Sequence, residues 1–138
     1  MPSTILLVED DAGHARLTQE AFKEGRLDIA IHTVTNGEAA MAFLRHEAPY
    51  HEAPTPDLVL LDLKLPRKDG REVLTELRAD AKFNALPVII FSTSEAEQDV
   101  YEAYRLHANC YIAKPMDLDE YLRVIDAIQR FWLKRASA

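Results

Sequence analysis

Short apolar runs alternate with amphipathic stretches along the chain. The apolar runs are residues 5–8, 29–34, 58–61, 88–91 and 109–113. Runs of this length that lack regular polar positions are typical of strands covered on both faces, as in parallel sheets. The intervening stretches have helical spacing, so we predict an α/β fold of the (βα)5 type. This is a doubly wound, five-stranded parallel sheet.

Capping residues mark where several helices should begin. Asn36 precedes the stretch "GEAAMAFLRH" and is a good N-cap. Ser94, with Glu97 three positions later, predicts a capping box for a helix that runs to about Leu106. Asp117 opens "DLDE" and predicts the start of the last helix. The first and third helices are expected at 13–25 and 71–80.

One segment, "HEAPYHEAPTP" at 46–56, does not fit the alternation. Its two histidines lie beside two glutamates, which could suggest a metal site. Three prolines among polar residues are more typical of an exposed loop. We therefore interpret the segment as a surface loop.

Composition narrows the class of protein. With 138 residues the chain is expected to form a single domain over 1–138. A formal charge of −7 argues against non-specific nucleic-acid binding. The lone Cys110 cannot form an internal disulfide, which favours a reducing compartment. The N-terminal apolar run is too short for a signal peptide or a membrane span, so we expect a cytoplasmic protein without a membrane partner.

Chemically active side chains follow four of the predicted strands. Where each strand ends, the chain carries Glu9-Asp10-Asp11, Asp62, Ser92-Thr93 and Lys114-Pro115. Taken singly, each could be a helix cap or a solvated loop residue. Because function in open parallel sheets gathers at the carboxyl ends of the strands, we expect them to share one crevice.

These residue types suit phosphoryl transfer. Clustered carboxylates repel one another unless a cation lies among them, and magnesium prefers such oxygen ligands. A carboxylate can also act as a nucleophile and form an acyl phosphate. We predict that Asp62 attacks, that Glu9 and Asp10 hold the metal, and that Lys114 and Ser92 contact phosphoryl oxygens.

Four motifs carry a resemblance to a known family. "ILLVEDD", "LVLLDLKLPRKDG", "PVIIFSTS" and "YIAKP" occur in this order, and the chain resembles a response-regulator receiver domain over about residues 4–133. The resemblance implies a flavodoxin-like receiver fold with Asp62 as phosphoacceptor. Glu9 and Asp10 match the acidic pair that holds Mg²⁺, and the backbone carbonyl of Lys64 would be a further metal ligand. Lys114 matches the family's lysine.

The resemblance also implies a switch and partners. Ser92 and Tyr111 match the hydroxyl and aromatic positions that rearrange on activation, altering the face of the fourth helix, fifth strand and fifth helix. The phosphoryl donor would be a sensor histidine kinase. A lengthened segment before the third strand and an "FWL" ending resemble stand-alone regulators partnered with phytochrome-type kinases, so a bacteriophytochrome is the expected kinase. No output domain is expected, so the signal would pass to a downstream protein or a phosphotransfer protein.

Two departures from the family pattern concern the site. Ser92 replaces the more frequent threonine and keeps the hydroxyl. Lys64 replaces a small polar residue. Its side chain either lies at the mouth of the site and slows hydrolysis of the phosphoryl group, or is an ordinary solvated lysine.

Other functions fit less well. An aspartate-nucleophile phosphatase needs a second acid two residues after the nucleophile, and Lys64 occupies that position. The four glycines cannot assemble a P-loop or a GxGxxG motif. The predicted phosphoacceptor is not an enzyme, because it has no separate substrate. The remaining alternative is a receiver-like scaffold that binds partners without phosphorylation.

The last helix carries more apolar residues than one buried face needs. Those expected to cover the sheet are Leu118, Tyr121, Leu122, Ile125 and Trp132. Val124, Ile128 and Phe131 are expected on a flank, where they would form a homodimer interface. Alternatively, Phe131 folds back over the domain's own edge.

Overall fold

Five parallel strands form one sheet in the order β2-β1-β3-β4-β5. The computed structural model describes residues 3–25 and 28–133. The strands are β1 (Ser3–Val8), β2 (Ile29–Val34), β3 (Leu58–Leu61), β4 (Val88–Ser92) and β5 (Cys110–Ala113). The helices are α1 (Ala12–Lys23), α2 (Gly37–Leu44), α3 (Gly70–Ala79), α4 (Glu97–Arg105) and α5 (Leu118–Ile128), which continues as a π-helix, η1 (Gln129–Leu133). The predicted (βα)5 fold is confirmed.

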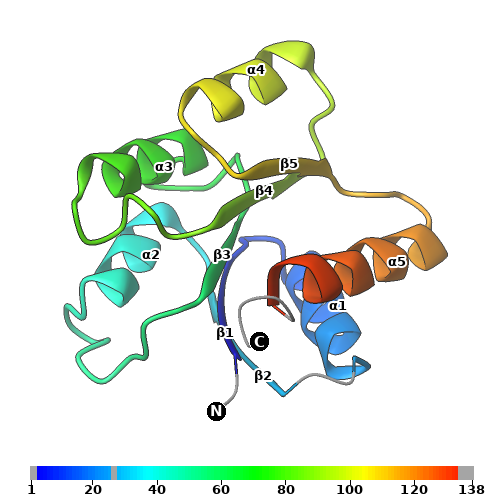
Figure 1. Cartoon of the computed structure of the whole chain (residues 1–138), viewed down its shortest axis with the longest axis horizontal. Coiled ribbons are helices and arrows are strands. Elements are labelled where there is room, and N and C mark those ends of the chain that lie inside the picture. Colours follow the sequence, from blue (N-terminus) through cyan, green and yellow to red (C-terminus); the bar gives the residue numbers. More distant parts are fainter. Residues whose placement is uncertain (1–2, 26–27, 134–138) are drawn as a thin grey trace.

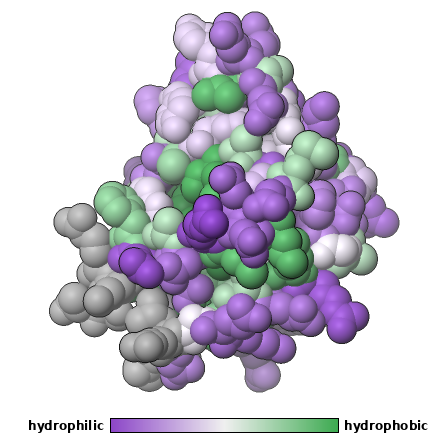
Figure 2. All heavy atoms as spheres, turned by 90° about the vertical axis from the view of Figure 1, so that its right-hand side faces the viewer, coloured by the Kyte–Doolittle hydropathy of each residue, from purple (hydrophilic) through white to green (hydrophobic). Residues whose placement is uncertain are grey.

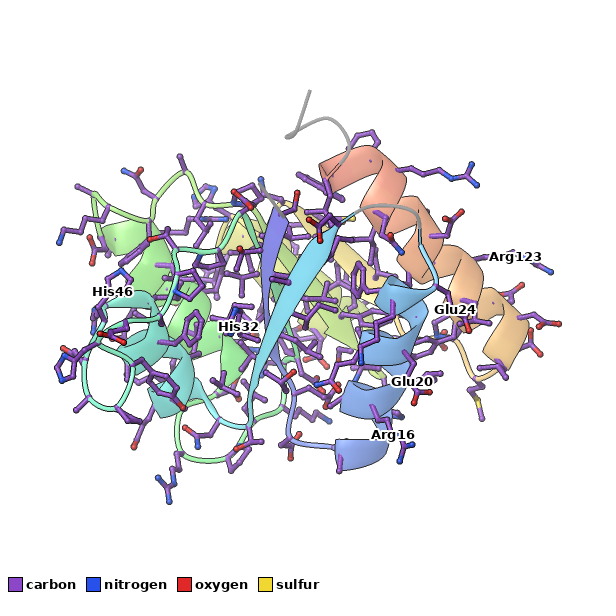
Figure 3. The ribbon with its side chains drawn as sticks, turned by 90° about the horizontal axis from the view of Figure 1, so that it is seen from below. Arg16, Glu20, Glu24, His32, His46 and Arg123 are labelled. Carbon is purple, nitrogen blue, oxygen red and sulfur yellow. The ribbon has the colours of Figure 1, made fainter. Side chains whose placement is uncertain are left out.

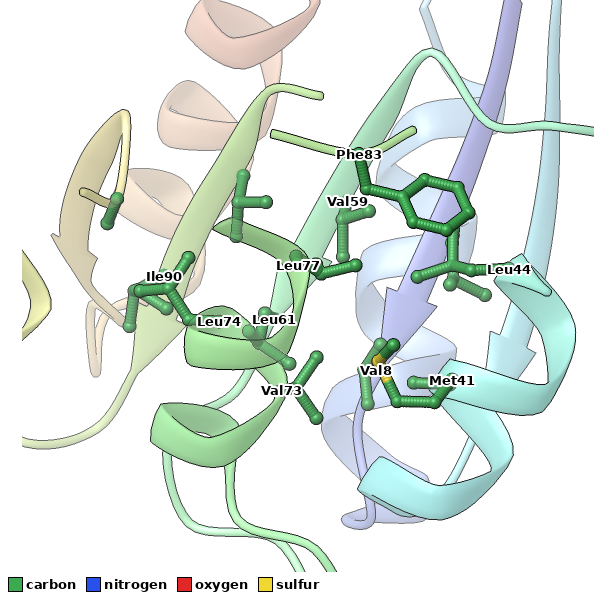
Figure 4. Packing of buried hydrophobic residues seen from close by; sticks show 14 of the residues in the cluster. Val8, Met41, Leu44, Val59, Leu61, Val73, Leu74, Leu77, Phe83 and Ile90 are labelled. Atoms are coloured by element: carbon green, nitrogen blue, oxygen red, sulfur yellow. The ribbon is translucent and has the colours of Figure 1, made fainter. Parts of the chain in front are cut away.

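Two layers of helices cover the two faces of the sheet (Figure 1). Successive strand residues point to opposite faces, so Leu6 and Val8 pack with α2, α3 and α4, whereas Ile5 and Leu7 pack with α1 and α5. Figure 4 shows the first of these clusters, in which residues of α2 and α3 meet β1, β3 and β4. The inner strand β3 and all of β4 but its last residue are apolar because both of their faces are buried, whereas the edge strand β2 is half-buried and carries His32 and Thr33.

The connection after β2 decides where the site can form. From β1 the chain crosses to β2 at one edge, and it then returns past β1 to β3 on the other side. The strand order therefore reverses between β1 and β3. Ligands of open α/β sheets bind beside the carboxyl ends of the strands at such a point.

Side-chain caps begin four of the helices. The side chains of Asp11, Asn36, Asp69 and Asp117 each accept a backbone hydrogen bond at the start of α1, α2, α3 and α5. The predicted caps at Asn36 and Asp117 are thus confirmed. Each cap satisfies one of the backbone N–H groups that the first turn leaves without a helical partner.

The predicted capping box at Ser94 is wrong. Helix α4 begins at Glu97, its N-cap is Ala96, and no side chain among the described residues caps it. Ser94 lies two residues before the cap, and its hydroxyl donates to the Asp99 carboxylate. The helix begins too late for Ser94 to be its N-cap, and the serine oxygen instead accepts from the Ala96 N–H (3.3 Å) within the loop between β4 and α4.

The buried face of the last helix also differs from the prediction. Ile128, expected on the flank, is 2% exposed, whereas Leu118, expected against the sheet, is 56% exposed. Tyr121, Ile125 and Ile128 lie on one stripe that packs on the sheet. Leu118 continues this stripe but belongs to the first turn, which extends past the core, and the wider turn of η1 changes the spacing of the residues that follow Ile128.

The 46–56 segment is largely exposed, as predicted, but it is anchored by one aromatic side chain. Phe43 lies between His32 and Tyr50, with both ring-centroid distances 5.4 Å. Figure 3 shows His32 on the edge strand β2, on the side where α2 lies.

No helix in the described part of the chain is long and apolar enough to cross a bilayer.

Candidate functional site

The strand registers bring the predicted site residues to one end of the sheet. Val8 and Leu61 are partners across β1 and β3, so the next residues, Glu9 and Asp62, emerge side by side. The Asp62 N–H donates to the Val8 carbonyl (3.0 Å). On the other side, the Lys114 N–H donates to the Ser92 carbonyl (2.7 Å), which places the lysine beside the end of β4.

A buried lysine connects two of the carboxylates. The Lys114 ammonium donates to Glu9 Oε1 and, at 3.1 Å, to Asp62 Oδ2. The side chains of Lys114 and Glu9 are 2% and 3% exposed, and that of Asp62 is 12% exposed. Asp62 Oδ1 accepts from the Leu63 N–H (2.7 Å), so both of its oxygens are held. Charge-assisted bonds of this kind fix the direction in which the carboxylate points.

Burial and crowding shift the pKa values of this group. The pKa of Glu9 is raised to about 7: burial is the main cause, Lys114 opposes the shift, and the neighbouring Asp62 adds to it. Burial lowers the pKa of Lys114, but hydrogen bonds and charge from Glu9 and Asp62 outweigh it, so its pKa lies above the usual value. The lysine is therefore cationic, and one positive charge serves two carboxylates.

Within the described residues, one group of side chains has the spacing of a metal site. Ligand oxygens of Glu9, Asp10 and Asp62 lie within 4.8 Å of one another. Asp10 is exposed, whereas the side chain of the adjacent Asp11 caps α1 and is not part of the group. Hard oxygen ligands with an open side suit Mg²⁺ or Mn²⁺. A divalent cation fits because a single lysine leaves excess negative charge. The histidines of the 46–56 segment are not part of this group.

The loop after Asp62 approaches the strand closely, and Gly70 permits this approach. A Cβ atom at Gly70 would lie 2.3 Å from the carbonyl oxygen of Asp62 and 2.9 Å from that of Leu63. The Gly70 N–H donates to the Leu63 carbonyl (2.9 Å), which closes the loop. Lys64, within this loop, has an exposed side chain.

Ser94 joins the two predicted switch residues. Its N–H donates to the Ser92 hydroxyl oxygen (3.2 Å), and its carbonyl accepts from the Tyr111 hydroxyl (2.8 Å). Its own hydroxyl binds Asp99 at the start of α4, and Asp99 forms an ion pair with Arg71 of α3. These bonds connect Ser92, through Ser94, to Tyr111 and to α4.

His14 is a site residue that sequence reasoning missed. Its Nδ1 lies 3.2 Å from the Lys114 ammonium nitrogen. Both side chains line a cavity of about 540 Å³ beside the site, together with residues that follow β4 and β5. His14 lies four residues beyond Asp10 in the first turn of α1, and no motif in the sequence pointed to it.

Known proteins resemble the chain over almost its whole length. The family model of the response regulator receiver domain matches residues 5–126. Response regulator Rcp1 of Synechocystis sp. is 43% identical over 133 residues, covering 96% of this chain and 90% of Rcp1. The structure of the phosphorylated cyanobacterial phytochrome response regulator RcpA is 44% identical, with a TM-score of 0.93, and the match covers 98% of this chain and 96% of that one. The Mn²⁺-bound form of Rcp1 has a TM-score of 0.91 at 43% identity, with 96% of both chains covered.

Proposed function

Because the chain belongs to the family of response regulator receiver domains, we propose that it accepts a phosphoryl group onto Asp62 from a sensor histidine kinase. The observation that carries the proposal is the placement of Asp62 between a buried lysine and two further carboxylates. Asp62 is a largely buried acid whose two oxygens are oriented by Leu63 and Lys114. It lies at the point where the strand order reverses, so a donor can approach it from outside the sheet.

The proposed reaction exchanges one bond to phosphorus for another. An oxygen of Asp62 forms a bond to phosphorus while the bond from phosphorus to the donor imidazole nitrogen breaks, and that nitrogen keeps the electron pair. The product is an acyl phosphate. Lys114 is positioned to neutralise charge on the phosphoryl oxygens, and Glu9 keeps the ammonium in place.

Glu9, Asp10 and Asp62, with the backbone carbonyl of Lys64, would hold Mg²⁺. When bound, the ion would supply neutralisation of the charge that gathers on the phosphoryl oxygens. The Mn²⁺-bound structure of Rcp1 supports a divalent cation in a related protein.

The signal would leave the site through Ser92, Ser94 and Tyr111. The Ser92 hydroxyl would turn toward the new phosphoryl group, and the bonds that Ser94 makes to Ser92, Tyr111 and Asp99 support a coupled response. The face of α4, β5 and α5 would then change its packing and meet a downstream protein or phosphotransfer protein.

Similarity to RcpA supports a phytochrome-type histidine kinase as the donor. Such a kinase, autophosphorylated with labelled ATP, should transfer its label to this protein faster than unrelated histidine kinases do. Equal transfer from all of them would argue against this partner.

Labelling with a small phosphodonor and magnesium tests the acceptor. The wild type should gain one base-labile, acid-stable phosphoryl group, and Asp62→Asn should gain none. Asp57→Asn, at the other end of β3, is the matched control and should be labelled normally. Asp10→Ala should bind magnesium severalfold more weakly.

The same experiment addresses the scaffold alternative. A wild type that gains no label from small donors or from kinases, while still binding a partner, would favour a scaffold. Label that persists in Asp62→Asn would place the acceptor elsewhere.

A further inference from the structure

The Lys114 ammonium has three partners, one for each of its N–H donors. Two are the carboxylates of Glu9 and Asp62, and the third is Nδ1 of His14 at 3.2 Å. The histidine comes from α1 and not from a strand end. It is therefore not one of the site residues that were predicted from the ends of the strands.

The backbone at His14 is fixed by the helix cap. The His14 N–H donates to Asp11 Oδ1 (2.9 Å), which ties the residue to the first turn of α1. An ammonium group can only donate, so Nδ1 must carry a lone pair. The ring in this contact is therefore neutral, with its proton on Nε2.

The three partners are not equivalent. The bonds to the two carboxylates join opposite charges, whereas the bond to the imidazole joins a cation to a neutral acceptor, so the bond to the imidazole is the weakest of the three. It is also the one on the open side, because His14 is half-buried and lines the adjacent cavity, whereas Glu9 is 3% exposed. A new anion that needs a donor from Lys114 would displace His14 first.

From this we infer that His14 is a positioning residue that occupies one N–H of Lys114 in the unphosphorylated protein and releases it to a phosphoryl oxygen. The inference rests on the proposed function, since it presupposes a phosphoryl group on Asp62. The histidine satisfies the third N–H of the buried Lys114 ammonium, and it competes with a phosphoryl oxygen for that N–H.

The first test is the affinity for beryllofluoride, a phosphoryl mimic, in the presence of magnesium. His14→Leu should bind it between about twofold and tenfold more tightly than the wild type, because the hydrogen bond from Lys114 to the imidazole is lost from the unphosphorylated state alone. His14→Asn keeps an acceptor near the place of Nδ1 and should stay close to the wild type. His51→Leu, an exposed histidine far from the site in sequence, is the matched control. Unchanged or weaker binding in His14→Leu would overturn the inference.

The second test needs no variant. Nitrogen chemical shifts of the His14 ring should show the Nε2–H tautomer in the metal-free protein, and the shift of Nδ1 should change when magnesium and beryllofluoride are added. An Nδ1–H tautomer, or a ring that does not respond to the bound mimic, would contradict the proposed role. Failure of the proposed function can be told apart from failure of this inference. If Asp62 is not a phosphoacceptor, the wild type neither gains label nor binds beryllofluoride. The tautomer of the His14 ring would still show whether the ring accepts from Lys114.

Discussion

At the scale of single residues, burial changes the protonation of Glu9. Its carboxylate is buried beside Asp62, and these surroundings raise its pKa from 4.5 to about 7 even though Lys114 is a direct partner. The folded protein therefore holds a proton on Glu9 in a pH range where the unfolded chain does not. A divalent cation would compete with that proton.

This shift predicts a pH-dependent stability in the presence of a chelator. The contribution of Glu9 is fully present below pH 4.5 and is lost as the pH rises through about 7. The free energy of unfolding should fall by about 3 kcal/mol across this range, because each unit of pKa shift corresponds to about 1.4 kcal/mol. Urea unfolding at about pH 5 and pH 8 measures it, and the amide of Glu9→Gln should remove most of the difference. Identical pH dependence in both proteins would show that Glu9 does not titrate in this range.

At the scale of elements, one arginine ties together two connections at the end of the sheet opposite the site. Arg78, in the last turn of α3, donates to several backbone carbonyls and one side-chain amide. Its acceptors are the carbonyls of Phe83, Asn84, Leu86 and His107 and the side-chain oxygen of Asn109. The same Asn109 oxygen accepts from the Val88 N–H at the start of β4. The planar fork of a guanidinium suits this set, whereas a lysine ammonium would reach only part of it.

Arg78→Ala should therefore lower the free energy of unfolding by about 3 kcal/mol, since it leaves carbonyls of both connections without a donor. Arg78→Lys should recover little of this loss. Arg105→Ala, which removes an exposed arginine from the last turn of α4, is the control and should change stability by less than about 0.5 kcal/mol. Denaturant unfolding of the three variants distinguishes them. Equal stability of Arg78→Ala and the wild type would mean that water replaces the guanidinium without cost.

At the scale of the whole molecule, the face that carries α5 has the surface expected of an interface. Figure 2 shows this side, on which apolar side chains come to the surface next to a central group of hydrophilic ones. Phe131 is 57% exposed, and its ring lies 5.3 Å from that of Trp132, so it has not folded back fully over its own domain. Because Ile128 is buried, the apolar flank is smaller than the sequence suggested.

We predict that the protein dimerises through this face, with the modest affinity that a small patch provides. Sedimentation at tens of micromolar (roughly the range for a modest interface) should detect a dimer of the wild type and a monomer of Phe131→Glu. Phe131→Leu keeps an apolar side chain and should retain the dimer. A wild-type monomer with and without beryllofluoride would refute the prediction.

The order of strands and helices, and the gathering of the strand-end side chains at one edge of the sheet, could be read from the sequence itself. A buried parallel strand must be apolar on both faces, so the runs at 58–61 and 88–91 could be recognised locally. The residue that ends such a strand must lie at the carboxyl edge of the sheet, which is why the sequence alone could place Glu9, Asp62 and Lys114 together.

The tertiary structure decided whatever depends on how elements pack against one another. Ile128 is buried and Leu118 is exposed although both lie on the same helical stripe, because helical periodicity carries no information about how far along the helix the core extends. Ser94 is not the cap because α4 begins at Glu97, two residues later than a cap at Ser94 would require. His14 meets Lys114 across 100 residues of sequence, since the packing of α1 against the sheet sets that distance. Local sequence therefore determines which residues end each strand, whereas packing between elements determines which further side chains reach them.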